Sequence, residues 1–184
     1  MAELLQYFGE DLKPLKIELE ALLCGITLDT KGFSFNTGPR TFEAASYLKS
    51  SGADSGEVIK LVQDDLIIYT EKAEIVKNAE ILDNGIAIAK CPKIEYSSLI
   101  AAQAADDLLT IKGVSASFVI SDTDGGVSIS GRSLGDFNVQ LILESLGGGG
   151  HAAMAAAAIE GISVDAACEI LKETINEYIS EDRL

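Results

Sequence analysis

Four consecutive glycines, residues 147–150, stand directly before His151, the single histidine of the chain. Glycines carry no side chain and permit positive φ, so successive backbone N–H groups can line a concavity that holds an anion. His151 at the lip of such a loop suits a contact to a phosphate or a base. If the alanine-rich run 152–158 begins a helix, its N-terminus adds donors and a favourable dipole. The alternative is a flexible connection with a packed histidine.

A second candidate is Arg132, which follows Ser130 and Gly131 in an alternating stretch. On a strand of period two, Ser130 and Arg132 share a face, and the guanidinium presents a planar fork of donors matched to phosphate or carboxylate. The chain has only 14 basic residues, so an arginine beside glycines at a strand end stands out. The alternative is a surface ion pair with one of the many acids.

The third candidate is Asp29, three residues after Ile26 and seven after Leu22. This spacing predicts that its carboxylate projects from the apolar face at the C-terminal end of a helix. Burial and the negative end of the helix dipole both oppose a charge there, and a metal cation or a paired arginine would compensate. The alternative is that Asp29 caps the turn at residues 30–32.

Other catalytic arrangements find little support in the residues. With one histidine, neither a Ser/His/Asp nor a Cys/His set can be assembled, and no complete catalytic metal site can be nominated. We interpret Asp106 and Asp107 as a solvated helix edge, and Asp122 with Asp124 as part of a hairpin turn. The chemically suitable residues of this chain therefore make up only part of a catalytic site.

The elements that must position these residues change in character near residues 83–85. Before this point the apolar spacing predicts only helices, and no strand before about Ile86; they are expected at 17–29, 41–50, 55–63 and 66–82. After it, strands and helices alternate: strands at 86–89, 114–121 and 127–132, and helices at 97–109, 136–146 and 163–179. The prediction is an all-helical part followed by an α/β part.

Composition limits the ligands. The 184 residues include 29 acidic and 14 basic side chains, a formal net charge of −15, which disfavours binding of long nucleic acids. A small ligand with one or two phosphates needs only a few donors and stays open. No apolar run approaches the ~20 residues of a membrane span, and no signal peptide is recognisable. The three cysteines, Cys24, Cys91 and Cys168, are scattered, which favours buried thiols in a reducing compartment.

A resemblance to a known family extends over nearly the whole chain. The residues that show it are 129–140 and the loop 147–151, together with the helical stretches 22–31 and 37–48. The sequence resembles the DHH phosphoesterase superfamily with its DHH-associated C-terminal domain, and most closely the cyclic-di-AMP phosphodiesterases of the GdpP type. The resemblance implies that residues 1–84 are the helical C-terminal part of a DHH catalytic domain. Residues 85–184 would form an α/β DHH-associated nucleotide-binding domain with a small mixed sheet.

The resemblance also implies roles for individual residues. The family's catalytic centre holds two Mn²⁺ ions, and Asp29 matches one of their ligands. The substrate-binding residues implied are Ser130, Arg132, Ser133, Gly148, Gly149, Gly150 and His151, with Arg40 and Asn138 as weaker candidates. The D-x-D motif, a further aspartate and the His-His pair of the family are absent. We therefore expect a C-terminal fragment of a longer phosphodiesterase that binds nucleotide phosphate and does not hydrolyse it.

The expected partner is cyclic-di-AMP or another small dinucleotide, with the fragment in the cytoplasm and its parent anchored in the membrane. A homodimer is left open. One alternative is the nanoRNase or single-strand exonuclease branch of the superfamily, which the absence of tryptophan, 6% aromatic residues and net acidity disfavour. The other alternative is a nucleotide-binding module without catalysis.

Overall fold

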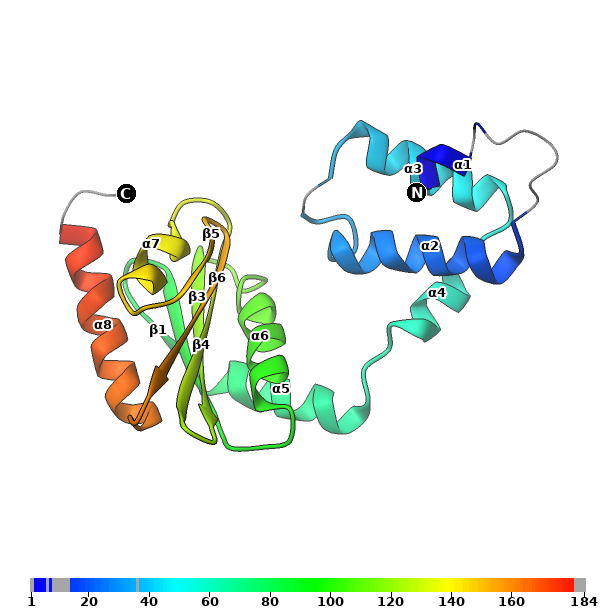
Figure 1. The fold of residues 1–184 in the computed structure, drawn as a ribbon. Coiled ribbons are helices and arrows are strands. Elements are labelled where there is room, and N and C mark those ends of the chain that lie inside the picture. The colour runs from blue at the N-terminus through cyan, green and yellow to red at the C-terminus, as the bar shows by residue number, and fades with distance from the viewer. Residues whose placement is uncertain (1, 6, 8–13, 36, 181–184) are drawn as a thin grey trace. The chain divides into compact units, whose positions relative to one another are not determined.

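The computed structural model describes residues 2–5, 7, 14–35 and 37–180, and Figure 1 shows their fold. The chain forms two compact units, residues 1–64 and 65–184. Each unit has its own hydrophobic core and is described by itself.

The first unit is helical, as predicted. Its helices are α1 (Ala2–Leu5), α2 (Lys16–Asp29), α3 (Pro39–Ser50) and α4 (Ser55–Leu61). Helices α2, α3 and α4 meet over the buried side chains of Leu19, Leu23, Leu48 and Val58. Asp54 caps α4, since its Oδ1 accepts a hydrogen bond of 2.7 Å from Gly56 N.

The second unit is an α/β fold with a six-stranded mixed sheet in the order β1-β2-β3-β4-β6-β5. Strands β2 and β3 are parallel, and the other neighbours are antiparallel. The elements are α5 (Leu66–Lys77), β1 (Glu80–Ile81), β2 (Ile86–Cys91), α6 (Ser97–Leu108), β3 (Ala116–Thr123), β4 (Gly126–Ser133), α7 (Val139–Glu144), β5 (Gly149–His151), β6 (Met154–Glu160) and α8 (Val164–Ser180). The expected fold class is confirmed.

Helices cover the two faces of the sheet unequally. On one face, α7 and α8 pack over a large core around Phe118, Ile129 and Leu171, which also buries alternate residues of β6. On the other face, α5 and α6 pack over β2 and β3, with Ala89, Ala101 and Val119 in that core. Figure 1 shows α7 and α8 on one side of the strands and α6 on the other.

Two expectations about secondary structure were wrong. Residues 80–81 are not the end of a helix, because α5 ends at Lys77 and β1 pairs with β2. The alanine-rich run is strand β6, not a helix, and it pairs with β4 along its length. Alanine favours helices intrinsically, but Ala155 and Ala157 are buried at a spacing of two, which only a strand on this core provides.

Helix α5 belongs to the second unit. Its Ile75 is 2% exposed and lies in the same core as Ala104 and Leu108 of α6. The units therefore divide between Asp64 and Asp65, earlier in the chain than the change of character near residues 83–85.

All three thiols are free, with Cys91 and Cys168 buried and Cys24 half-buried. Burial raises the pKa of the Cys91 thiol to about 11, which keeps it protonated. Among the helices of the described ranges, none is long and apolar enough to cross a membrane.

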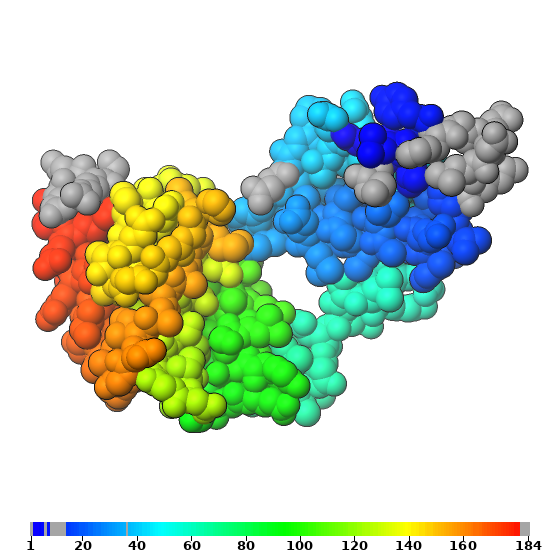
Figure 2. Space-filling model, in the orientation of Figure 1, coloured from blue at the N-terminus to red at the C-terminus, as the bar shows by residue number. Residues whose placement is uncertain are grey.

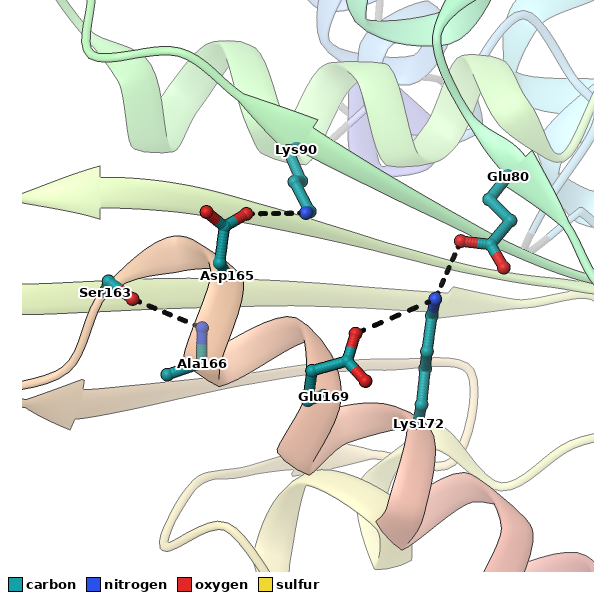
Figure 3. Close-up of polar contacts among 7 residues, drawn as sticks. All are labelled: Glu80, Lys90, Ser163, Asp165, Ala166, Glu169 and Lys172. Atoms are coloured by element: carbon teal, nitrogen blue, oxygen red, sulfur yellow. Dashed lines mark hydrogen bonds and ion pairs between the residues drawn. The ribbon is translucent and has the colours of Figure 1, made fainter.

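Ion pairs fasten α8 to the edge of the sheet, as Figure 3 shows. Lys90 Nζ lies 2.6 Å from Asp165 Oδ1, and Lys172 Nζ lies 2.8 Å from Glu80 Oε2. These contacts join β2 and β1 to positions about two turns apart on α8. The hydrogen bond from Lys90, and then its charge, lower the pKa of the Asp165 carboxyl.

We expect Asp165→Asn to destabilise the chain at pH 7 and to lose this effect in acid. A carboxyl whose pKa is lowered by folding stabilises the fold above its unfolded pKa, and the contribution is lost as the pH falls through the folded pKa. Urea unfolding of both proteins from pH 7 to about pH 3 measures the difference. Glu173→Gln, an exposed acid on the same helix, controls for net charge. A destabilisation that does not decrease between pH 7 and pH 3 would contradict the assignment to ionised Asp165.

Candidate functional site

On the α6 side of the sheet, α6 covers β2, β3 and part of β4, and the face is open over β6 and β5. Helix α6 covers β2 and β3, whereas Met154, Ala156 and Ala158 of β6 are exposed on the same side. Figure 2 shows atoms of the β5–β6 region, yellow to orange, at the surface of the second unit. This uncovered area, which we call the open face, contains the side chains of Ser128, Ser130, Arg132, His151, Met154, Ala156 and Ala158.

Strand register brings two predicted site residues into one row. Arg132 of β4 lies opposite Met154 of β6, and Met154 lies opposite His151 of β5. Directly opposite residues in neighbouring strands project from the same face of a sheet. Ser117 of β3, opposite Arg132, donates a hydrogen bond of 2.6 Å from Oγ to Ala105 O of α6, so this row faces the α6 side. Arg132 and His151 therefore lie on the open face, two strands apart.

The Arg132 guanidinium is held in place by α6. Its Nε donates to Asp106 Oδ1 at 2.8 Å and its Nη1 donates to Gly131 O at 2.9 Å. The Arg132 side chain is 11% exposed and that of Asp106 is 25% exposed, so the pair is partly shielded from water. The ion-pair alternative for Arg132 is thus observed, while the interpretation of Asp106 as a solvated helix edge was wrong. Among the contacts of the described residues, Nη2 remains for a ligand.

The other polar candidates of the α/β part divide between the two faces. Ser130 is 7% exposed, and its neighbours across the strands on the open face are Ala156 and Gly149. Ser133 is buried toward the opposite core, where its Oγ accepts hydrogen bonds from Gly135 N and Phe137 N. Asn138 Oδ1 caps α7 by accepting from two backbone N–H groups. Ser133 and Asn138 therefore organise the loop before α7.

The glycine run serves the fold at specific positions. Gly147 N donates to Glu144 O at 3.0 Å and Gly148 N donates to Leu143 O at 2.8 Å, so both amides close the end of α7. A Cβ at Gly148 would overlap Ala156 O, and one at Gly150 would overlap Met154 O. A Cβ at Gly149 would meet nothing within 4 Å. Close approach of β5 to β6 thus requires glycine at 148 and 150, and leaves 149 free.

In the first unit, Asp29 lines a hollow of about 400 Å³. Its neighbours there include Thr30, Glu3 and Arg40. The expectation that Asp29 projects from the apolar face was wrong, since its side chain is exposed at the end of α2. The buried face of α2 runs through Leu19 and Leu23, and Asp29 falls outside this stripe.

Arg40 donates two hydrogen bonds to the Glu3 carboxylate, from Nε at 2.7 Å and from Nη2 at 2.6 Å. The hydrogen bond to Glu3, and then the charge of Glu3, raise the pKa of Arg40. Across the described ranges, no three His, Cys, Asp or Glu side chains are grouped to hold a metal ion. Asp29 and Glu3 are the acids that line the hollow, and both Glu3 oxygens accept from Arg40. The residues described therefore do not fit a two-metal centre.

Comparison with known proteins identifies the fold. Residues 83–179 match the DHHA1 domain. The chain belongs to the DHHA1 domain family. The Cyclic-di-AMP phosphodiesterase GdpP of Geobacillus thermodenitrificans is 48% identical over 180 residues, 97% of this chain and 27% of that protein. The chain thus spans about a quarter of the length of such relatives.

Solved structures that resemble this chain include the following two. An exopolyphosphatase-related protein from Bacteroides fragilis superposes with a TM-score of 0.78 at 21% identity, over 89% of this chain and 51% of that one. RecJ from Thermus thermophilus, crystallised in complex with Mn²⁺, superposes with a TM-score of 0.50 at 13% identity, over 90% of this chain and 24% of that one. Both likenesses concern the fold.

A second hollow, of about 430 Å³, lies at the end of β2 beside α5. Lys90, Cys91, Lys93 and Glu71 are among its lining residues, and none of the site residues predicted from the sequence is. Lys90 and Lys93 both form ion pairs, with Asp165 and Asp124.

Sequence reasoning missed where Asp106 and Met154 lie: Asp106 is on α6 beside Arg132, and Met154 is on the open face of the DHHA1 domain. Asp106 positions Arg132 from a helix 26 residues earlier in the chain, a pairing that no local pattern reveals. Met154 lies between Arg132 and His151 only because residues 154–160 form a strand. An alternation signal could have found it, but alanines at four successive positions hide any alternation.

We expect Gly148→Ala to lower the free energy of unfolding by about 1–3 kcal/mol, because the added methyl group overpacks against β6. Gly149→Ala is the matched control, with a change within about 0.5 kcal/mol, since its Cβ meets open space. Urea unfolding of the three proteins measures both. Equal stability of the two variants would show that the close approach of β5 to β6 is no constraint.

Proposed function

We propose that this chain is the nucleotide-binding part of a cyclic-di-AMP phosphodiesterase of the GdpP type. The open face of its DHHA1 domain would hold a phosphate of the nucleotide between Arg132 and His151. The support is 48% identity over nearly the whole chain to a cyclic-di-AMP phosphodiesterase, together with the alignment of these two side chains in one row.

The main structural support for the proposal is the geometry around Arg132. Asp106 and Gly131 O fix the guanidinium through Nε and Nη1, so Nη2 is held in one orientation before a ligand arrives. Neighbouring strands are about 5 Å apart, which separates Arg132 from His151 by about 10 Å. Side chains of these lengths can converge on one phosphate from that separation. The net charge of −15 makes such a focused site better suited to a small dinucleotide than to a long polyanion.

Asp29 is proposed as one carboxylate ligand of the Mn²⁺ centre of the parent protein. Since the described residues do not fit that centre, we propose that the chain alone binds nucleotide without hydrolysing it. Ser130 is proposed to contact the nucleotide from the floor of the open face. Ser133, Asn138 and Gly148 would support the site through the loops they organise. The proposed setting is the cytoplasm, with the parent protein membrane-anchored.

Arg132→Gln should weaken binding of AMP and of cyclic-di-AMP about tenfold or more, because a charge-assisted hydrogen bond contributes about 1.5–3 kcal/mol. Arg132→Lys should also weaken binding, since lysine keeps the charge and loses the fork. His151→Gln should weaken binding as well. Isothermal titration calorimetry on the purified chain measures each dissociation constant.

Lys93→Gln is the matched control for loss of one positive charge. Lys93 pairs with Asp124 in the β3–β4 turn, at the opposite end of β4 from Arg132, so its loss should leave affinity unchanged. Equal weakening by Lys93→Gln and Arg132→Gln would mean that general charge, not the Arg132 geometry, attracts the nucleotide.

Hydrolysis is tested on the parent protein and the chain side by side with Mn²⁺. The parent should cleave cyclic-di-AMP in preference to short oligonucleotides when both are present, and the purified chain should cleave neither. Preference for oligonucleotides would favour the nanoRNase or exonuclease alternative, and an inactive parent would favour a non-catalytic binding module. Turnover by the chain alone would overturn the claim that it lacks a catalytic centre.

A further inference from the structure

Met154 is an apolar side chain in a polar setting. It is 46% exposed on the open face, directly opposite Arg132 on one side and His151 on the other. A single exposed apolar residue is ordinary on a protein surface. Its position between the two groups proposed to hold phosphate is what requires an explanation.

The next row on the same face consists of small residues. Ser130, Ala156 and Gly149 lie opposite one another across β4, β6 and β5, two residues along from Arg132, Met154 and His151. Because these side chains are short, the Met154 thioether stands above a low floor. The arrangement has a flat floor, one apolar wall and two polar groups along the same edge.

A flat ring with apolar faces and a polar rim fits this shape. Sulfur in methionine makes favourable contacts with aromatic rings, and its flexible side chain adapts to the ring it meets. A ring on the Gly149 and Ala156 floor would lie against Met154 and keep its attached phosphate near Arg132 and His151. A sugar phosphate without a base would leave Met154 untouched.

We propose that Met154 is a specificity-determining residue that contacts the nucleobase, an inference that rests on the proposed function of the open face. Arg132 and His151 hold phosphate irrespective of the base. Met154 supplies the preference for a nucleotide over a sugar phosphate. Position 154 therefore sets base preference, and the two polar residues set phosphate affinity.

The chain offers two natural reporters for this proposal, because it contains two methionines, Met1 and Met154, and one histidine, His151. In a chain labelled with ¹³C-methyl methionine, AMP should shift the Met154 methyl signal upfield through the ring current and also shift the His151 imidazole signal. Ribose 5-phosphate should shift the His151 signal alone. Met154→Leu assigns the methyl signal by removing it.

Affinity gives a second, independent measurement. Met154→Ala should weaken AMP binding about two- to tenfold, the range expected for one sulfur–ring contact, and leave ribose 5-phosphate binding unchanged. Met154→Leu should recover part of the loss. Ile170→Ala is the matched control, because Ile170 is 38% exposed on α8, which packs on the opposite face.

The outcomes separate the two proposals. If AMP shifts the His151 signal without moving the Met154 methyl, the role of Met154 is overturned and the phosphate site stands. If neither compound moves either signal, both proposals fail. A methyl shift that AMP produces and ribose 5-phosphate does not supports the inference.

Discussion

The pairing of β6 with β4 is the constraint on which the site depends. It turns an alanine-rich segment with high helix propensity into a strand, buries Ala155 and Ala157, and leaves Met154, Ala156 and Ala158 on the open side. The same pairing fixes the position of β5, since Gly148 and Gly150 lie against the β6 backbone where no Cβ fits. Without this register, Arg132 and His151 would have no defined relation to each other.

Helix α6 determines which part of its sheet face is covered. Helix α6 approaches β2 and β3 closely through Ala101, Ala104 and Ala105, and its edge toward β4 carries Asp106. The carboxylate holds Arg132 at the boundary between the covered and uncovered halves of the face. One helix thus completes a core and also orients the guanidinium beside the open face.

Much of the fold could be predicted from the sequence, because apolar residues recur regularly in β3 and α8. The hairpin between β3 and β4 could be predicted from Asp124 and the two glycines after it.

The predictions that failed did so for physical reasons. Alanine repeats carry no face preference, so the strand at β6 depended on tertiary context, and β1 contains only two residues. Asp29 was misplaced because Leu22 and Ile26, used to locate the apolar face, are half-buried on its flank. The candidate site residues on β4 and β5 were recognisable from residue type and resemblance. The ion pair of Arg132 with Asp106 was not, because the two residues are 26 positions apart in the sequence.

The different packing of neighbouring glycines divides the β5 hairpin into fixed and variable positions. Residues 148 and 150 cannot accept a side chain without moving a backbone, whereas positions 149, 151 and 154 face open space or solvent. Substitutions at the second group would change the side chains that the hairpin presents to solvent and leave the strand pairing intact. The exposed surface of this hairpin can therefore change by single substitutions, each of which passes through a folded protein.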